Sequence, residues 1–329
     1  MLPARLAAQL LAGEPAPHAV AVAERLLAVQ AQDARGARLA VRARTLGSGT
    51  TAADVDRALT HDRSLVVSWL NRGTLHLVRR EDWPWLHALT TPPLAAGSRR
   101  RLAQEGVTPA AARKGVAAIE RALADEGPLT REQLRERIAA AGVRTEGQAL
   151  VHVLLAASLR GLVVRGPMAG ARHAFALTRD WLGEEATAPV DRDAALAELA
   201  RRYLAGHGPA SDRDLARWSG LPLRDARAGL KAIAAQLVQR PPAGRAAAAG
   251  AAPLLDLAER PAGPAARLPP PRLLGAFDPL LLGWASRDDV LGERGTGIVT
   301  TNGIFRPFAL VRGRAAGLWR LERGRVALE

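Results

Sequence analysis

A helix-turn-helix pattern recurs three times along the chain, and this repetition constrains the fold more than any other feature. The first copy ends in two apolar β-like runs, at residues 64–70 and 74–78, which Asn71-Arg72-Gly73 joins. Asn and Gly tolerate positive φ angles, so this junction predicts a β-hairpin. Helices followed by a two-stranded hairpin are the outline of a winged-helix unit.

The second copy has the same outline. It begins at a capping box, with Thr130 as the N-cap and Gln133 at the reciprocal position. A helix expected over residues 146–160 precedes two β-like runs, at 162–165 and 173–177. Repetition of such units indicates an ordered array of small modules, although helix-turn-helix units also occur in protein-interaction modules.

The third copy opens at residues 209–215, and its second helix is expected from residue 223 to about residue 237. Residues 241–272 are rich in Ala, Pro and Gly, which predicts a loop-rich boundary. Beyond it come four β-like runs, at residues 272–277, 297–301, 308–311 and 317–321. These runs predict a small barrel or sandwich.

The expected fold class is therefore α+β, with tandem winged-helix (helix-turn-helix) units followed by a small C-terminal β-barrel. A chain of 329 residues is too long for one ordinary core. We expect three winged-helix units, at residues 1–98, 99–188 and 189–243, and a β-barrel domain at residues 244–329.

The charge balance favours a polyanionic partner. The chain has 46 Lys and Arg residues against 32 Asp and Glu residues, a formal charge of +14, which is typical of nucleic-acid binding. Nearly all the basic residues are Arg, however, and a GC-rich coding sequence would produce the same bias. Charge alone therefore does not decide the function.

Several classes of protein are excluded or disfavoured. The absence of Cys excludes disulfides, thiolate metal sites and iron–sulfur clusters. The seven His residues lack metal-ligand spacing, so we expect no metal and no cofactor. No stretch resembles a signal peptide or is long enough to span a bilayer. We therefore expect a cytoplasmic, nucleoid-associated protein with no membrane partner.

Three short motifs point to one family. Gln30-Ala31-Gln32 follows an early helix, residues 72–76 read Arg-Gly-Thr-Leu-His, and the C-terminal region contains two further segments, at 274–283 and 302–307. In this order they resemble the signatures of the AlkZ/YcaQ-type winged-helix DNA glycosylases, in the Gln-x-Gln branch. The resemblance covers roughly residues 17–325. It implies removal of alkylated bases, including crosslinked ones, by winged helices around DNA and a barrel that closes the site.

The resemblance implies that Gln30 and Gln32 are catalytic. N7-alkylation makes the purine cationic, so the base leaves without protonation from an oxocarbenium-like transition state. That state needs an aligned water and electron-rich dipoles, which glutamine carbonyls supply. Residues i and i+2 point apart on a helix, so the two side chains converge only if the helix ends near Val29. On a continuing helix Gln30 would pair with Asp33, a conventional base that we rank below Gln32.

Five residues are expected to contact DNA. Arg72 lies at the hairpin turn, and Asn302 and Arg306 flank a second hairpin that can enter the minor groove; the full set is Arg35, Arg72, His76, Asn302 and Arg306. Each has a structural alternative: a solvated Arg, a satisfied hairpin His, an ordinary exposed turn. Gln30 and Gln32 equally suit a helix end, with Asp33 capping the next helix. The seven tryptophans are expected in the core.

The sequence therefore predicts a monofunctional DNA glycosylase, a hydrolase of the N-glycosyl bonds of N7-alkylated purines. Its partner would be double-stranded DNA with alkylated bases, and unhooking of interstrand crosslinks, in repair or antibiotic self-resistance, is part of the hypothesis. We expect a monomer. A lyase mechanism is not expected, because Lys114 and Lys231 are the only lysines and both fall on predicted outer helices. The alternative is a non-catalytic winged-helix DNA-binding protein or transcriptional regulator.

Overall fold

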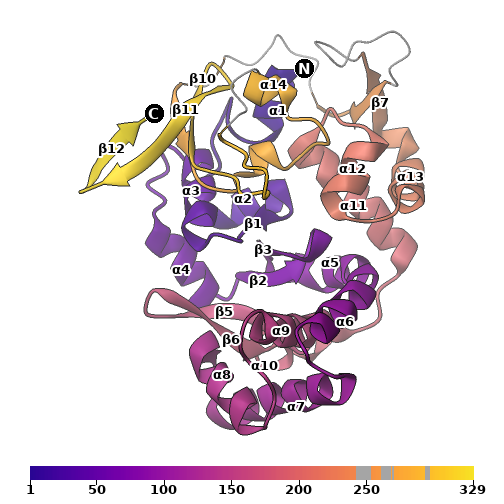
Figure 1. Cartoon of the computed structure of the whole chain (residues 1–329). Helices are drawn as coiled ribbons and strands as arrows, with labels where there is room; N and C mark the ends of the chain where they lie inside the picture. The colour runs from indigo at the N-terminus through magenta and orange to yellow at the C-terminus, as the bar shows by residue number, and fades with distance from the viewer. Residues whose placement is uncertain (242–252, 261–267, 269, 293–296) are drawn as a thin grey trace. The chain divides into compact units, whose positions relative to one another are not determined.

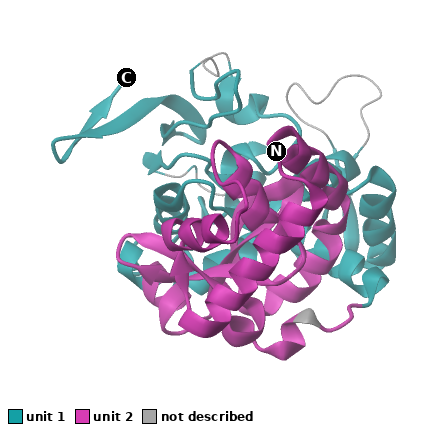
Figure 2. Cartoon of the chain, turned by 60° about the horizontal axis from the view of Figure 1, so that its bottom comes forward, with its two compact units in different colours: residues 1–54, 191–329 teal, residues 55–190 magenta. Residues whose placement is uncertain are grey.

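The chain divides into two compact units that do not follow the sequence order. The computed structural model describes residues 1–241, 253–260, 268, 270–292 and 297–329. Unit 1 consists of residues 1–54 and 191–329, and unit 2 of residues 55–190 (Figure 2). Helix α4 (Ala52–Thr60) carries the chain from the first to the second.

Helix α11 (Arg192–His207) is the packing centre of unit 1. It contacts α2 (Ala19–Leu26) and α13 (Leu223–Ala232). A glycine lies at each crossing: a Cβ on Gly206 would overlap the backbone of α2, and one on Gly229 would overlap the backbone of α11. The helices therefore approach each other closely only because these positions have no side chain. Unit 1 also contains α1 (Leu2–Ala8), α3 (Ala34–Arg44), α12 (Asp212–Ser219) and α14 (Asp288–Leu291).

Aromatic rings fill the core on the C-terminal half of α11. The ring of Tyr203 stacks on His207 at 4.7 Å and lies 5.2 Å from Trp218. The Tyr203 hydroxyl donates to the carbonyl of Gly283 at 2.7 Å, and the Trp284 indole N–H donates to the carbonyl of His207 at 2.9 Å. These bonds fasten the segment after residue 278 to the helix. Six tryptophans are buried, as expected, and Trp85 is half-buried; the six are Trp69, Trp83, Trp181, Trp218, Trp284 and Trp319.

The C-terminal strands form an open sheet. Their order is β12-β11-β10-β9, antiparallel throughout, so β9 and β12 are its two edges. The expected β-barrel is not confirmed, because the described strands do not close on themselves. β12 has no buried residue that could form the inner face of a barrel, and with β11 it makes a long two-stranded ribbon (Figure 1). The bounds are β9 (Arg272–Leu274), β10 (Phe308–Val311), β11 (Arg314–Glu322) and β12 (Arg325–Leu328).

A second small sheet in unit 1 lies partly in the expected loop-rich boundary. β7 (Leu237–Arg240) pairs with β8 (Leu254–Leu257), and Ala210 bridges to Leu255. The boundary at residues 241–272 therefore contains a strand that composition did not predict. Residues 242–252, 261–267 and 269 of that boundary lie outside the described residues.

Unit 2 contains the two predicted hairpins. β2 (Leu65–Leu70) pairs with β3 (Thr74–Arg79), and β5 (Val163–Ala169) pairs with β6 (Arg172–Leu177). Within this unit the strand order is β3-β2-β5-β6-β4, with β4 (Leu129–Thr130) at the end. The first hairpin was expected from its β-like runs and turn residues and the second from its β-like runs, and both are confirmed.

Helices cover this sheet, and their starts follow the sequence signals. The capping box of α8 (Arg131–Ala140) is present, with Thr130 and Gln133 bonded reciprocally. The order α7, β4, α8, α9, β5, β6 is the outline expected of the second repeat. The other helices are α5 (Trp83–Thr90), α6 (Ala95–Gln104), α7 (Pro109–Glu126), α9 (Ala149–Leu159) and α10 (Thr178–Leu182).

The fold class is thus mixed α+β. The assignment of three winged-helix units and the four domain boundaries stay predictions. Among the described residues, no helix combines the length and apolar character that a membrane crossing needs.

Candidate active site and DNA interface

The Gln-x-Gln segment is not helical, which is the condition its convergence requires. Helix α2 ends at Leu26, and Leu27 then adopts a positive φ of 63°. The chain continues as the short strand β1 (Val29–Gln30), and the next helix begins only after Asp33. The arrangement in which Gln30 pairs with Asp33 along one helix is therefore excluded.

The two glutamines differ in exposure. Gln30 is 6% exposed, whereas Gln32 is exposed. Residues two apart on extended chain point to the same side, and the segment bends at Gln32. The Gln32 side chain is therefore accessible from solvent, whereas the Gln30 amide is enclosed by protein.

Asp33 has the structural role foreseen as its alternative. It is the N-cap of α3, and its carboxylate accepts a hydrogen bond from the backbone N–H of Gly36. N-capping satisfies a donor that the helix leaves free and places a negative charge at the positive end of the helix dipole. Engagement in a cap supports the lower rank given to Asp33 as a general base.

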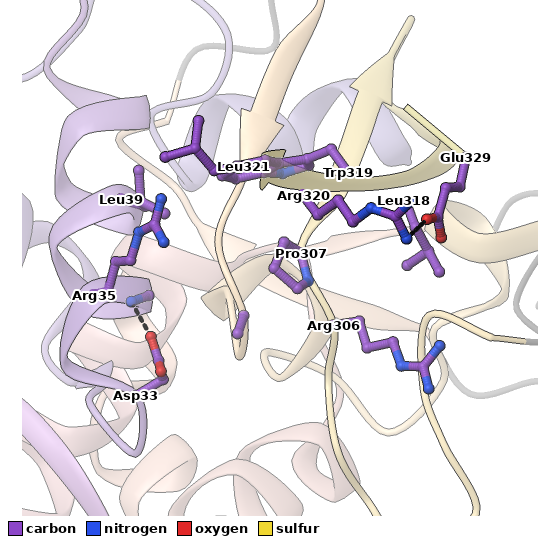
Figure 3. Close-up of a pocket in the computed structure, with 12 residues that line it drawn as sticks. Asp33, Arg35, Leu39, Arg306, Pro307, Leu318, Trp319, Arg320, Leu321 and Glu329 are labelled. Atoms are coloured by element: carbon purple, nitrogen blue, oxygen red, sulfur yellow. Dashed lines mark hydrogen bonds and ion pairs between the residues drawn. The ribbon is translucent and has the colours of Figure 1, made fainter. Parts of the chain in front are cut away.

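A pocket of about 540 Å³ lies beside this cap and brings two expected DNA contacts together. Figure 3 shows Asp33 and Arg35 on one side of it and Arg306 on another, with Pro307 between them. Neither the Arg35 nor the Arg306 guanidinium has a hydrogen bond or ion pair to any described residue. The remaining lining residues are Gly36, Leu39, Ala276, Leu318, Trp319, Arg320, Leu321 and Glu329.

Close backbone approach builds the floor of this pocket. A Cβ on Gly36 would overlap the carbonyl oxygen of Ala276, and Gly275 touches the same turn of α3. Residues 275–276 belong to the sequence motif at 274–283, and their backbone with small or absent side chains leaves room for α3. Arg320 also lines the pocket, but its positive charge is balanced by an ion pair with Glu329.

A buried ion pair also fixes α3 to the same motif. Arg44 donates to both carboxylate oxygens of Asp278, at 3.0 and 2.9 Å, and to the side-chain oxygen of Gln9 at 2.9 Å. Arg44 and Asp278 are completely buried. Asp278 also caps the turn that follows by accepting from the N–H of Leu280. Its role is therefore structural.

The second expected hairpin is a tight turn whose tip is exposed. Val299 bridges to Phe305, and the N–H of Thr300 donates to the carbonyl of Ile304 at 2.9 Å. Asn302 lies exposed at the tip, and Arg306 follows at the base of the turn, beside the pocket. The strand expected over residues 297–301 is reduced to this one bridge; residues 293–296 before it lie outside the described residues.

Arg72 and His76 lie together on the β2–β3 hairpin of unit 2. Arg72 has a φ of 57° in the turn and is half-buried. His76 is 2% exposed, and its Nδ1 lies 3.0 Å from the carbonyl of Thr74. Burial, and next the positive charge of Arg72, lower the pKa of His76 to about 3. His76 is therefore neutral near pH 7 and is not a cationic phosphate contact.

The structure thus groups the expected residues by unit. Gln30, Gln32, Arg35, Asn302 and Arg306 belong to unit 1, while Arg72 and His76 belong to unit 2. Sequence reasoning missed the part of the pocket that β11 supplies, Trp319 and Leu321, because nothing in that strand's pattern indicates which element it faces. No cluster of His, Asp and Glu suited to a metal ion occurs among the described residues.

Comparison with known proteins decides the class. The family model of the DNA glycosylase AlkZ-like proteins matches residues 23–329. This chain belongs to that family. It is 28% identical over 331 residues to the interstrand DNA cross-link repair glycosylase of Streptomyces sahachiroi, a match that spans 96% of this chain and 86% of the relative.

A solved structure of a DNA glycosylase has a similar fold. The chain resembles that of the Streptomyces sahachiroi DNA glycosylase AlkZ with a TM-score of 0.76 and 26% identity, over 99% of this chain and 88% of that one. As a member of the AlkZ-like family the protein is a DNA glycosylase, an enzyme whose substrate is DNA. The non-catalytic regulator is accordingly not favoured.

Proposed function

We propose that this glycosylase hydrolyses the N-glycosidic bond of N7-alkylated purines in double-stranded DNA and that it unhooks interstrand crosslinks. The observation that carries the proposal is the Gln-x-Gln motif on a non-helical segment, with Gln32 exposed at its end. The name of the Streptomyces sahachiroi relative, a cross-link repair glycosylase, supports the crosslink part.

In the proposed mechanism the two glutamines divide the work. The exposed Gln32 orients the attacking water through its side-chain carbonyl, and the carbonyl of Gln30 stabilises positive charge as it develops on the sugar. A cationic N7-alkylpurine leaves without a proton donor, so neutral amides suffice. The gain comes from dipoles that the protein holds in place before the reaction starts.

The proposed DNA contacts follow from charge and exposure. Arg35 and Arg306, unpaired within the described residues and on different sides of the pocket, bind phosphates of the damaged strand. Asn302 at its exposed tip enters a groove of the duplex, and Arg72 contacts the backbone from the other hairpin. His76 contributes as a neutral ring that supports the Arg72 turn. We propose that the protein acts as a monomer of tandem winged-helix units.

Base release by glutamine variants tests the catalytic assignment. Gln32→Ala and Gln30→Ala are each expected to slow release of N7-methylguanine by about a hundredfold, because one aligned dipole at a developing charge contributes roughly 2–4 kcal/mol. DNA affinity should stay nearly unchanged. Gln236→Ala, which removes an exposed glutamine elsewhere in unit 1, is the matched control. Normal excision by the Gln30/Gln32 double variant would refute the assignment and return Asp33 as the base.

Salt dependence of binding tests the phosphate contacts. Arg72→Ala and Arg306→Ala are expected to weaken binding equally for damaged and intact duplexes. Each should lower the slope of log K against log salt by about one released counterion. An effect confined to the damaged duplex would show that the residue reads the lesion instead of the backbone.

A further inference from the structure

Unit 2 contains an apolar groove whose lining includes none of the residues assigned to the glycosylase reaction. Its volume is about 330 Å³, and it lies where α6, α7 and α9 meet. The floor consists of buried aliphatic side chains, Leu102, Val107 and Val116, and small residues such as Ala112 and Ala156 keep it open. We refer to it as the α6–α9 groove.

Three arginines from three different segments surround this groove. Arg99 comes from α6, Arg113 from α7, and Arg160 follows α9 directly. All three are exposed, and none has a hydrogen bond or ion pair to a residue in the described part of the chain. Three arginines without acidic partners among the described residues, placed around one apolar groove, suit a ligand that has an apolar group with acidic groups on either side of it.

A buried polar group points to a ligand as well. Ser98 lines the groove, is only 7% exposed, and its hydroxyl has no hydrogen-bond partner in the described structure. Leaving a buried hydroxyl unbonded costs free energy. A peptide carbonyl in the groove would accept a hydrogen bond from it and remove that cost.

We propose that the α6–α9 groove binds an acidic peptide segment of a partner protein through one large apolar side chain. The volume is at the low end for ligand sites, which suits a single anchoring side chain of the kind that dominates interface energetics. Nucleic acid fits less well, because none of the lining residues is aromatic and unpaired bases bind chiefly by stacking on aromatic rings.

The probe is a fluorescein-labelled synthetic peptide in which one Phe is flanked on both sides by acidic residues. Fluorescence anisotropy with the full-length protein should show saturable, micromolar binding. The same peptide with Ala in place of Phe should bind about tenfold more weakly, since the anchor contributes most of the binding free energy. Equal affinity for the two peptides would show charge attraction alone and overturn the proposal.

Groove variants locate the site. Arg113→Glu and Arg160→Glu should each weaken peptide binding by about tenfold, and Ala112→Trp should do so by filling the groove without a charge change. Arg121→Glu is the matched control, since it makes the same charge change at an exposed position two turns further along α7. It should alter peptide affinity by less than about twofold. Equal losses for Arg113→Glu and Arg121→Glu would contradict a specific site.

Measurements of DNA binding test the remaining possibility, that the groove binds DNA and not a peptide. In the groove variants, affinity for a duplex and release of N7-methylguanine should match the unmodified protein. Melting temperatures confirm that each variant is folded. Loss of duplex affinity in Arg113→Glu, Arg160→Glu and Ala112→Trp, together with no peptide binding by the unmodified protein, would make the groove part of the DNA path and overturn the inference.

Discussion

At the scale of single residues, the arginines of the unit 1 pocket and the buried histidine of the unit 2 hairpin differ in exposure and in charge. Arg35 and Arg306 are exposed and unpaired within the described residues, which suits binding of a polyanion. His76 is buried, and the positive charge of Arg72 adds to the effect of burial on its pKa. The buried imidazole packs in the hairpin without adding a charge. Because its pKa differs between the folded and unfolded states, it makes the free energy of unfolding depend on pH.

We expect His76 to contribute to the loss of unfolding free energy at acidic pH. In the unfolded chain this His takes up a proton near pH 6.5, whereas in the folded protein its pKa is about 3. Above pH 6.5 both states are neutral there and the residue causes no pH dependence. Between pH 6.5 and 3 the unfolded state binds more protons, so stability falls with falling pH, by at most about 1.4 kcal/mol per unit from this group.

Urea unfolding at several pH values measures this effect. The variant His76→Gln should show a shallower loss of unfolding free energy between pH 6.5 and pH 4 than the unmodified protein. Gln236→Ala, a change at an exposed residue that does not titrate, should leave the slope unaltered. Parallel curves for the unmodified protein and His76→Gln would mean that His76 is accessible to protons in the folded state.

At the scale of elements, the Arg44–Asp278 pair couples α3 to the C-terminal motif. α3 begins at the Asp33 cap directly after the Gln-x-Gln segment, so the pair also fixes the helix that follows the proposed catalytic residues. A buried pair contributes little relative to apolar residues of similar size, but a single buried charge left without its partner is strongly destabilising.

Variants of this pair should therefore be non-additive. Arg44→Met and Asp278→Leu are each expected to lower the unfolding free energy by about 3–5 kcal/mol, and the double variant should recover much of that loss. Chemical denaturation of the four proteins completes the double-mutant cycle. Additive losses would show that the two side chains do not interact in solution.

At the scale of the whole molecule, the chain has few aromatic residues for a closed base pocket: seven Trp, four Phe and one Tyr, and six of the Trp are buried. Many glycosylases flip the base into a tight pocket, which a base tethered to the opposite strand cannot enter. The pocket beside Asp33 is lined from α3, the 275–276 segment and β11, and two unpaired arginines lie at its sides. This arrangement suits a glycosylase that accepts bulky adducts.

Substrate range is the corresponding prediction. Bulky N7 adducts should be released as readily as N7-methylguanine, and uracil hardly at all, because its uncharged base needs more help to leave than an amide gives. Chromatography of released bases measures both. Because no lyase mechanism is expected, treatment with borohydride should also trap no Schiff base between the protein and abasic DNA. Strong uracil release, or rejection of every bulky N7 adduct, would contradict this reading of the chemistry.

Features that depend on neighbours in the chain were predictable from the sequence. The β2–β3 hairpin followed from the two apolar β-like runs around Asn71-Arg72-Gly73, and the capping box of α8 from Thr130 and Gln133, because turn and cap geometry is set within a few residues. The family motifs indicated the enzyme class in the same way, since their residue types and spacing can be read directly from the sequence.

Features that depend on distant segments were decided only by the tertiary structure. The discontinuous unit 1, the open C-terminal sheet and the approach of Gly36 to Ala276 all join residues far apart in sequence. Composition and periodicity indicate which residues are apolar or charged, but not which element covers them. The buried Arg44–Asp278 pair and the pocket of Arg35 and Arg306 arise from that packing, so the sequence named these residues' chemistry while the fold decided which of them meet.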